Sequence, residues 1–459
     1  MKRYKAIVPV ILAVVALIGC DLFEMQAQGD FIYSRDGMTF IVTNTTTSRA
    51  MIVGYTGRPD VVIPASIRGS RVAYIQQDAF RGRGLTSLKL PEGIEIISNW
   101  AFADNQLPSV TIPSSVITIG ELAFANNEIA ELTFAENSSV RHIWWGAFQN
   151  NRLTRVVIPD GIPHISFSVF RNNLLTEVII PDSVTIIQMN AFAGNYLEEI
   201  VIPNSVTQIW YGAFRDNLLT SVTIPDSVTQ IGLRAFANNR LTEIIIPDSV
   251  RQIGQSAFAN NYLTEVIIPN RIHFLWGFDN NKLTNVTIPD RITQIGFNAF
   301  DNNRLIEITI PDRVTDILDF AFANNYLTEV IIPNGVIGIG ANAFAGNQLT
   351  EVVIPDSVTF LGGFNDNKLT QVTIPDSVTH ILANAFADNE LASITIPDSV
   401  TQIWMDAFAR NQITSVTIGE GVNLIGDPFG LGFNAVYAVN GAGTFTRPHI
   451  NSGWTPSPR

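Results

Sequence analysis

Residues 239–260 read NRLTEIIIPDSVRQIGQSAFAN, and near-copies of this 22-residue stretch fill most of the 459-residue chain. Aligned on the proline of Ile-Pro, the copies place seventeen anchors at positions 64, 91, 113, 135, 159, 181, 203, 225, 247, 269, 289, 311, 333, 355, 375, 397 and 419, where Ala135 and Gly419 replace proline. The step is 22 residues, except for 27 at the first step, 24 at the fourth, and 20 after Pro269 and Pro355. Units of this length bury their apolar side only by stacking on one another.

Each unit follows the pattern Asn-x-Leu-x-x-Val-x-Ile-Pro-x-x-Val-x-x-Ile-x-x-x-Ala-Phe-x-x. The Leu-x-x-Val-x-Ile segment predicts a β-strand, because alternate side chains leave a strand on the same face. In one copy Val266 and Ile268 would point inward and Ile267 outward. The proline lacks an N–H group and ends the strand. Val-x-x-Ile then begins the return side, and the phenylalanine fills the interior beside a short helical turn.

An asparagine stands three residues after fifteen successive phenylalanines of the repeat. A buried amide can satisfy backbone groups of the neighbouring turn, so we predict that this column is structural. Its members are Asn105, Asn127, Asn151, Asn173, Asn195, Asn217, Asn239, Asn261, Asn281, Asn303, Asn325, Asn347, Asn367, Asn389 and Asn411.

Taken together, the Leu-x-x-Val-x-Ile segment, the Asn column and the Ile-Pro-x-x-Val-x-x-Ile-Gly-x-x-Ala-Phe motif resemble the BspA-like class of bacterial surface leucine-rich repeats. The resemblance covers about residues 52–426. It implies a β-rich (α/β) solenoid, a right-handed superhelix of about 17 turns with a parallel β-sheet on its concave side. We expect the solenoid proper to occupy residues 61–426.

The two ends depart from the repeat and predict caps. Residues 31–60 contain an Arg35-Asp36-Gly37 turn between β-rich stretches, which indicates a hairpin. Such a hairpin would cover the open edge of the first unit. After residue 426 the period is lost, and 435–437 and 444–446 predict a closing hairpin within a C-terminal cap and loose tail, 427–459.

The first residues are typical of a targeting signal. Three basic side chains precede the 13-residue apolar run 6–18, which is too short to span a bilayer but suits a signal peptide. The run ends Leu17-Ile18-Gly19-Cys20, which resembles the lipobox of bacterial lipoproteins. We therefore expect removal of residues 1–19, lipid anchoring at Cys20, and a tether over 20–30. A plain secretory signal followed by a stray cysteine is the alternative.

Composition excludes several functional classes. The formal net charge of −13 offers no basic field for nucleic acid, so none is expected as a partner. The single cysteine excludes a disulfide framework and a cysteine-based zinc cluster. The histidines form no spaced metal motif, and identical aspartate columns do not supply the contrasting carboxylates that an enzyme needs. We expect no catalysis, no cofactor and no metal site, although Ca²⁺ between stacked aspartates remains a hypothesis.

The outward column of the predicted strands gives the best candidate for binding. Glutamates often lie two residues before an outward aliphatic residue, and apolar residues rimmed by carboxylates suit a protein partner. The candidate residues are Glu177, Ile179, Glu199, Val201, Glu243, Ile245, Glu265, Ile267, Glu329, Ile331, Glu351 and Val353. The alternative explanation is that the aliphatic residues are there because they favour β-strands and the glutamates because they keep the surface soluble.

These features predict a non-catalytic lipoprotein that mediates protein–protein interaction or adhesion through an extended repeat face. The family resemblance implies host matrix or serum proteins, or the surfaces of other bacteria, as partners. We expect the outer membrane or cell surface rather than the periplasmic face of the inner membrane. A structural role, as an acidic envelope or periplasmic scaffold without a dedicated host partner, is the alternative.

Overall fold

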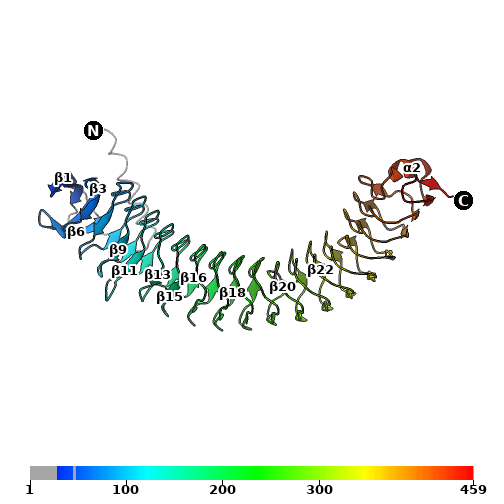
Figure 1. Cartoon of the computed structure of the whole chain (residues 1–459), viewed down its shortest axis with the longest axis horizontal. Helices are drawn as coiled ribbons and strands as arrows, with labels where there is room; N and C mark the ends of the chain where they lie inside the picture. The colour runs from blue at the N-terminus through cyan, green and yellow to red at the C-terminus, as the bar shows by residue number, and fades with distance from the viewer. Residues whose placement is uncertain (1–27, 45–47, 458–459) are drawn as a thin grey trace. The chain divides into compact units, whose positions relative to one another are not determined.

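A computed structural model of the chain describes residues 28–44 and 48–457. The chain divides into two compact units, one ending at Leu153 and the other beginning at Thr154. Within each unit, successive turns of the chain stack side by side in a solenoid (Figure 1). Residues 1–19, Cys20 and most of the predicted tether lie outside the described residues.

The first unit begins with an antiparallel meander that continues into the repeat. Its strands are β1 (Gln28–Arg35), β2 (Met38–Asn44), β3 (Arg49–Gly57), β4 (Asp60–Val62), β5 (Ser66–Ile67), β6 (Ser70–Ile75), β7 (Ser87–Lys89), β8 (Ile96–Ile97), β9 (Ser109–Ile112), β10 (Thr118–Ile119), β11 (Glu131–Phe134) and β12 (His142–Ile143). The predicted hairpin is confirmed: β1 pairs with β2, and Asp36 and Gly37 have φ of 52° and 77°. Strand β1 starts at Gln28 rather than at residue 31, because pairing with β2 extends into the predicted tether. Strand β3 then pairs in parallel with β6.

The second unit carries many short strands and one helix. They are β13 (Arg155–Val157), β14 (His164–Ile165), β15 (Glu177–Ile179), β16 (Ile186–Ile187), β17 (Gln208–Ile209), β18 (Gln230–Ile231), β19 (Gln252–Ile253), β20 (Phe274–Leu275), β21 (Gln294–Ile295), β22 (Asp316–Ile317), β23 (Gly338–Ile339), β24 (Phe360–Leu361), β25 (His380–Ile381), β26 (Ser393–Ile396), β27 (Gln402–Ile403), β28 (Ser415–Ile418), β29 (Asn423–Leu424), α2 (Phe433–Asn440), β30 (Gly443–Thr446) and β31 (Thr455–Pro456).

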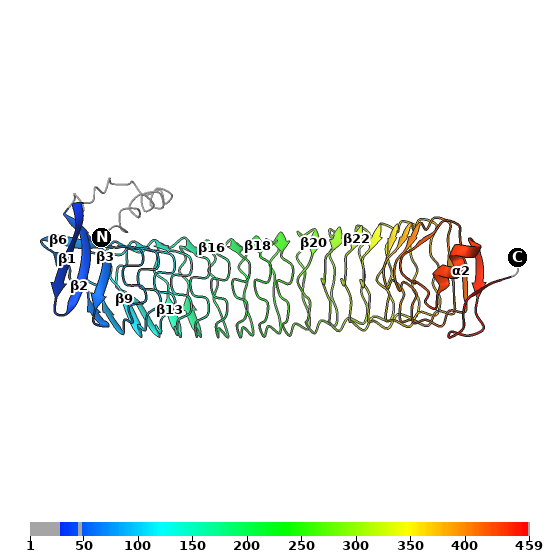
Figure 2. The same ribbon diagram turned by 90° about the horizontal axis from the view of Figure 1, so that it is seen from above.

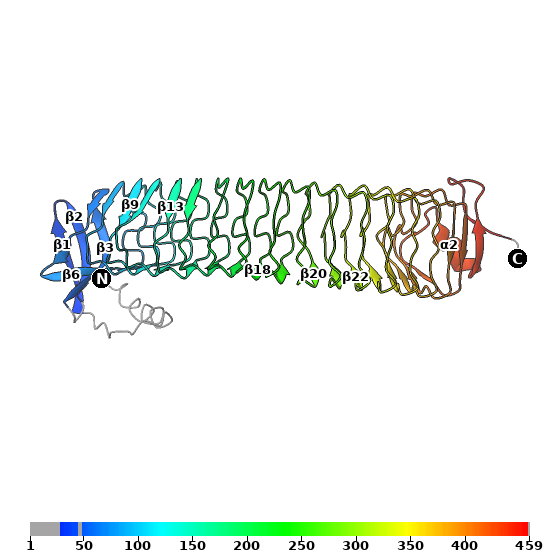
Figure 3. The same cartoon turned by 90° about the horizontal axis from the view of Figure 1, so that it is seen from below.

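Two parallel ladders run along opposite edges of the second unit, one with β13 and the other with β16, β18, β20 and β22 (Figures 2 and 3). The longer ladder lies in the Val-x-x-Ile segments, as a five-stranded sheet from β14 to β19 and an eight-stranded sheet from β20 to β29. The Leu-x-x-Val-x-Ile segments, where the sequence predicts the sheet, form strands only near the ends and isolated bridges between them.

The weaker ladder has two physical causes. The proline after each Leu-x-x-Val-x-Ile segment removes the N–H group that would extend the pairing. The hydrogen bonds between turns are also longer there: Thr242 N–H donates to the Thr220 carbonyl at 3.3 Å, whereas Thr229 N–H on the other edge donates to the Thr207 carbonyl at 2.8 Å. The main sheet therefore lies on the return side.

A column of stacked phenylalanines fills the interior. In the second unit, neighbouring rings from Phe170 to Phe429 have centroids 5.0 to 5.9 Å apart and planes within 15° of parallel. Inward residues of both ladders are buried with this column, such as Ile246 and Ile253, which are 5 and 2 % exposed. The short helical turn predicted beside the phenylalanine is a tight hydrogen-bonded turn, since residues such as Ser256 have φ of 53°.

The predicted C-terminal hairpin is wrong in its first half. Residues 435–437 belong to helix α2, because Phe433 and Tyr437 are spaced to bury one helical face. The Phe433 ring lies 4.5 Å from Phe429, and Tyr437 donates to the Gly419 carbonyl at 2.8 Å. Strand β30 pairs antiparallel with β28, so helix and strand together close the last turn.

Candidate protein-binding face

The acidic–aliphatic strip lies on the Leu-x-x-Val-x-Ile edge of the second unit. We define it by six pairs, Glu177/Ile179, Glu199/Val201, Glu243/Ile245, Glu265/Ile267, Glu329/Ile331 and Glu351/Val353, all of which are exposed. Val201, Ile245, Ile267, Ile331 and Val353 are 78 to 81 % exposed, whereas Ile179 is 43 % exposed. The residues beside them alternate inward, as strand geometry requires: Ile244 and Ile246 are each 5 % exposed.

Bridges between turns fix the order of this column. Val201 pairs with Thr223, Thr223 with Ile245, and Ile245 with Ile267. A second run joins Thr309 to Ile331 and Ile331 to Val353. Threonines therefore separate three aliphatic patches on adjacent turns of this column: Ile179 with Val201, Ile245 with Ile267, and Ile331 with Val353.

Most glutamates of the strip have no cationic partner. Glu177 pairs with Arg155 at 2.9 Å, but both side chains are about half exposed, so the pair contributes little to stability. Among the described residues, the other five glutamates form no ion pair. These five carboxylates are therefore exposed beside the aliphatic side chains without a neutralising charge.

A tyrosine column that the repeat pattern did not predict lies beside the strip. Tyr196, Tyr262 and Tyr326 stand between the ladder asparagine and the leucine of their units, and they are 46 to 54 % exposed. They recur at every third turn, in units that also carry a strip pair. The Lys282 ammonium of the next turn lies 4.2 Å from the Tyr262 ring centroid. Comparing the residue after each ladder asparagine would have revealed this column, whose aromatic rings are common in protein interfaces.

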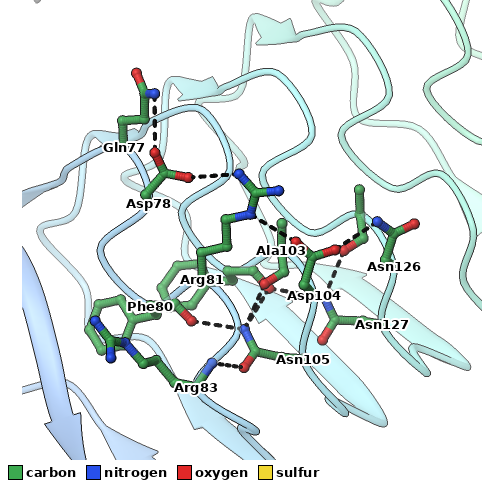
Figure 4. A network of polar contacts seen from close by, with 12 residues as sticks. Gln77, Asp78, Phe80, Arg81, Arg83, Ala103, Asp104, Asn105, Asn126 and Asn127 are labelled. Carbon is green, nitrogen blue, oxygen red and sulfur yellow. Dashed lines mark hydrogen bonds and ion pairs between the residues drawn. The ribbon is translucent and has the colours of Figure 1, made fainter.

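The asparagines form an inter-turn ladder in each unit. In the first unit, Asn105 Nδ2 donates to the Phe80 carbonyl at 2.9 Å, and its Oδ1 accepts from Arg83 N–H at 3.0 Å (Figure 4). The same Nδ2 donates to the Phe102 carbonyl, and Oδ1 also accepts from Leu85 N–H, both at 2.9 Å. In the second unit, Asn261 bonds Phe236, Phe258 and Leu241 in the same way at 2.9 to 3.0 Å. The fifteen asparagines are only 3 to 9 % exposed. Their amides hold backbone groups rather than face a ligand.

The described residues hold neither a cluster of metal-ligating side chains nor a membrane-spanning helix. No three His, Cys, Asp or Glu side chains within 28–44 and 48–457 gather closely enough to hold a metal ion. No helix in the same ranges is long and apolar enough to cross a membrane.

Comparison with known proteins identifies the family. A family model described as the BspA type leucine rich repeat region matches residues 61–175, 163–276, 275–363 and 362–429. Because these matches cover most of the chain, the protein belongs to the BspA-type leucine-rich repeat family. This confirms the resemblance carried by the repeat motif.

Several solved structures resemble the chain. YopM from Yersinia enterocolitica WA-314 is 18 % identical over 77 % of this chain and 82 % of its own, with a TM-score of 0.46. The pneumococcal vaccine antigen PcpA is 16 % identical over 86 % and 98 %, with a TM-score of 0.46. A leucine rich cell surface protein from Faecalibacterium prausnitzii A2-165 is 26 % identical over 87 % and 95 %, with a TM-score of 0.38. No curated protein matches the sequence.

Proposed function

We propose that this protein is a non-catalytic binding protein that holds a protein partner on the acidic–aliphatic strip. One observation carries the proposal: five β-branched side chains of a single column, Val201, Ile245, Ile267, Ile331 and Val353, are each about four fifths exposed. Single exposed aliphatic residues are ordinary, but aligned apolar residues rimmed by charge favour an interface. Their β-branched shape also keeps the strip stiff, so little side-chain entropy is lost on binding.

Charge indicates the kind of partner. Glu243, Glu265 and Glu329 flank aliphatic residues, and among the described residues these glutamates form no ion pair. The strip therefore suits a surface whose apolar centre is surrounded by Lys and Arg. The net charge of −13 would steer such a basic surface toward the chain at low salt. Tyr196, Tyr262 and Tyr326 add aromatic anchors of the type that dominates binding energy.

We further propose that lipid on Cys20 anchors the protein at the outer membrane or cell surface, and that host matrix or serum proteins or other bacterial surfaces are its partners. The competing proposal is an acidic envelope or periplasmic scaffold. Protease treatment of intact and permeabilised cells separates the two. Cleavage in intact cells supports surface adhesion, whereas protection until permeabilisation would contradict it.

The strip itself is tested by two triple variants. Threonine already occupies the same column at Thr223, so Ile245→Thr, Ile267→Thr and Ile331→Thr should preserve the fold. Glu243→Lys, Glu265→Lys and Glu329→Lys reverse the charge. We expect each set to weaken binding to an immobilised panel of matrix and serum proteins by about tenfold or more, which corresponds to about 1.4 kcal/mol.

A matched control carries the same change of charge outside the strip. Asp356→Lys, Asp376→Lys and Asp398→Lys alter exposed residues that follow the repeat prolines. This variant should keep its binding within about twofold. Equal losses in the control and the glutamate variant would mean that net charge, and not the strip, governs binding. Unchanged binding in both strip variants would refute the proposal.

A further inference from the structure

A serine ladder of the second unit is interrupted by arginines. Two residues after the repeat proline, a serine hydroxyl donates to a carbonyl of the preceding turn, as Ser227 does to Val206 at 2.6 Å and Ser249 to Val228 at 2.8 Å. In the next three turns this position holds Arg271, Arg291 and Arg313. Each substitution gives up one inter-turn hydrogen bond and stacks like charges on neighbouring turns, which is unfavourable unless something compensates.

The backbone ladder is also interrupted at this place. The N–H groups of Thr229, Arg251 and Thr293 each donate to the turn before at 2.8 to 3.0 Å. Among the described residues, His273 N–H makes no such bond to the Arg251 carbonyl, and the parallel sheet ends at β19 and resumes at β20. An open hollow of about 450 Å³ lies here, lined by Arg251, Asn270, Arg271 and Arg291.

The lining of the hollow presents hydrogen-bond donors and positive charge. Three guanidinium groups supply donors only, and all three are exposed. The position after the proline is aspartate at Asp248 and Asp290 but asparagine at Asn270, so the turn at the hollow lacks the usual carboxylate. Among the described residues, these arginines form no ion pair. This uncompensated cluster belongs to a chain whose net charge is strongly negative.

We propose that the arginine hollow, with Arg313 beside it, binds a sulfated polysaccharide. Guanidinium forks match the oxygens of sulfate in bidentate pairs. At about 4.8 Å per turn, Arg271, Arg291 and Arg313 form a row roughly 10 Å long, which suits charges repeated along a polymer.

Neighbouring residues favour a sugar over an acidic peptide. Asp290 and Asp312 stand beside the arginines in the sequence and are exposed. They repel carboxylates and sulfates alike, but they can accept hydrogen bonds from sugar hydroxyls, which a run of carboxylates does not offer. The Phe274 ring of the same turn is 54 % exposed and offers an apolar surface to a sugar ring.

The test compares the binding of dextran sulfate, neutral dextran, poly-glutamate and inorganic sulfate to the full chain. The variant Arg271→Ser, Arg291→Ser and Arg313→Ser restores the consensus serine, so its thermal stability should equal or exceed that of the parent. We expect dextran sulfate binding to fall at least tenfold in this variant and to weaken with salt. The control Arg83→Ser, Arg141→Ser and Arg234→Ser makes the same change of charge elsewhere and should stay within twofold.

Three outcomes would contradict the proposal. Unchanged dextran sulfate binding in the Arg271/Arg291/Arg313 variant would refute the site. Tighter binding of poly-glutamate than of dextran sulfate would assign the hollow to an acidic peptide. Sulfate ion binding as tightly as the polymer would reduce it to a simple anion site. The strip variants do not alter these arginines, so the protein-binding proposal can fail while this one stands.

Discussion

Asp279 follows the repeat phenylalanine of its turn, and Asp301 holds the same position on the next turn. The turns before and after these two have alanine there, at Ala259 and Ala323. Asp279 is 8 % exposed; its Oδ2 atom accepts from Asn280 Nδ2 at 3.1 Å, whereas its Oδ1 atom has no hydrogen-bond partner among the described residues. Burial raises the pKa of Asp279, and it also raises the pKa of Asp301 on the next turn. The folded chain therefore holds a proton at Asp279 more tightly than the unfolded chain does, so ionisation opposes folding.

Asp279→Ala should stabilise the protein at neutral pH and much less in acid. Above the raised pKa the buried carboxylate is charged, so removing it should raise the free energy of unfolding by about 1 kcal/mol. As pH falls through the raised pKa toward about 3.9, the ordinary value for aspartate, the gain should vanish. Urea unfolding at pH 7 and pH 4 measures both. Asp290→Asn, at an exposed site, is the control; an Asp279→Ala gain that does not depend on pH would contradict the explanation.

At the scale of the element, one turn is joined to the next by an asparagine rather than by side-chain packing alone. Asn261 donates to the Phe236 and Phe258 carbonyls and accepts from Leu241 N–H. The residue before it, Asn260, has a φ of 55°, which asparagine tolerates better than most residues. In the Asn-Asn pair, the first residue thus adopts the left-handed turn and the second makes the buried hydrogen bonds between turns.

Asn261→Asp should be severely destabilising, although it preserves the shape of the side chain. The carboxylate cannot donate to the two phenylalanine carbonyls, and its charge would be buried against them. We expect a loss of about 3 kcal/mol or more in urea unfolding at pH 7. Asn260→Asp is the matched control, because aspartate already occupies the equivalent position at Asp216 and Asp388. Similar losses in the two variants would contradict a special role for the buried amide.

A feature could be predicted from the sequence when it recurs in many units. The Phe column and the buried Asn column recur in turn after turn, so their periodicity indicated the solenoid and its core. The position of the main sheet could not be inferred, because Leu-x-x-Val-x-Ile alternates as a strand does, whereas the apolar residues of Val-x-x-Ile are three apart and do not indicate a strand. The proline limits pairing on the first segment, and no such residue interrupts the second. Helix α2 and the arginine hollow occur once, and a repeat consensus carries no information about features that occur once.

At the scale of the whole molecule, repetition also multiplies charge. Turn-by-turn copying places Asp356, Asp376 and Asp398 at the same position of consecutive units, and the chain has 41 acidic against 28 basic side chains. Two such charges about 5 Å apart repel by roughly 0.8 kcal/mol in water. In a repeat protein these nearest-neighbour terms add along the stack, so acid columns lower stability in proportion to their length.

The stability of the chain should therefore rise with salt. Raising NaCl from 10 to 150 mM shortens the screening length from about 30 to about 8 Å, which weakens repulsion between stacked carboxylates. We expect the urea midpoint to increase over this range, by a free energy on the order of 1 kcal/mol. A second series in CaCl₂ at matched ionic strength separates screening from binding at a site. Equal urea midpoints in the two salts indicate screening alone. A higher midpoint in CaCl₂ would show Ca²⁺ ions held between the aspartates. A midpoint that falls with NaCl would mean that ion pairs such as Arg410 with Asp388, 2.6 Å apart, outweigh the repulsion.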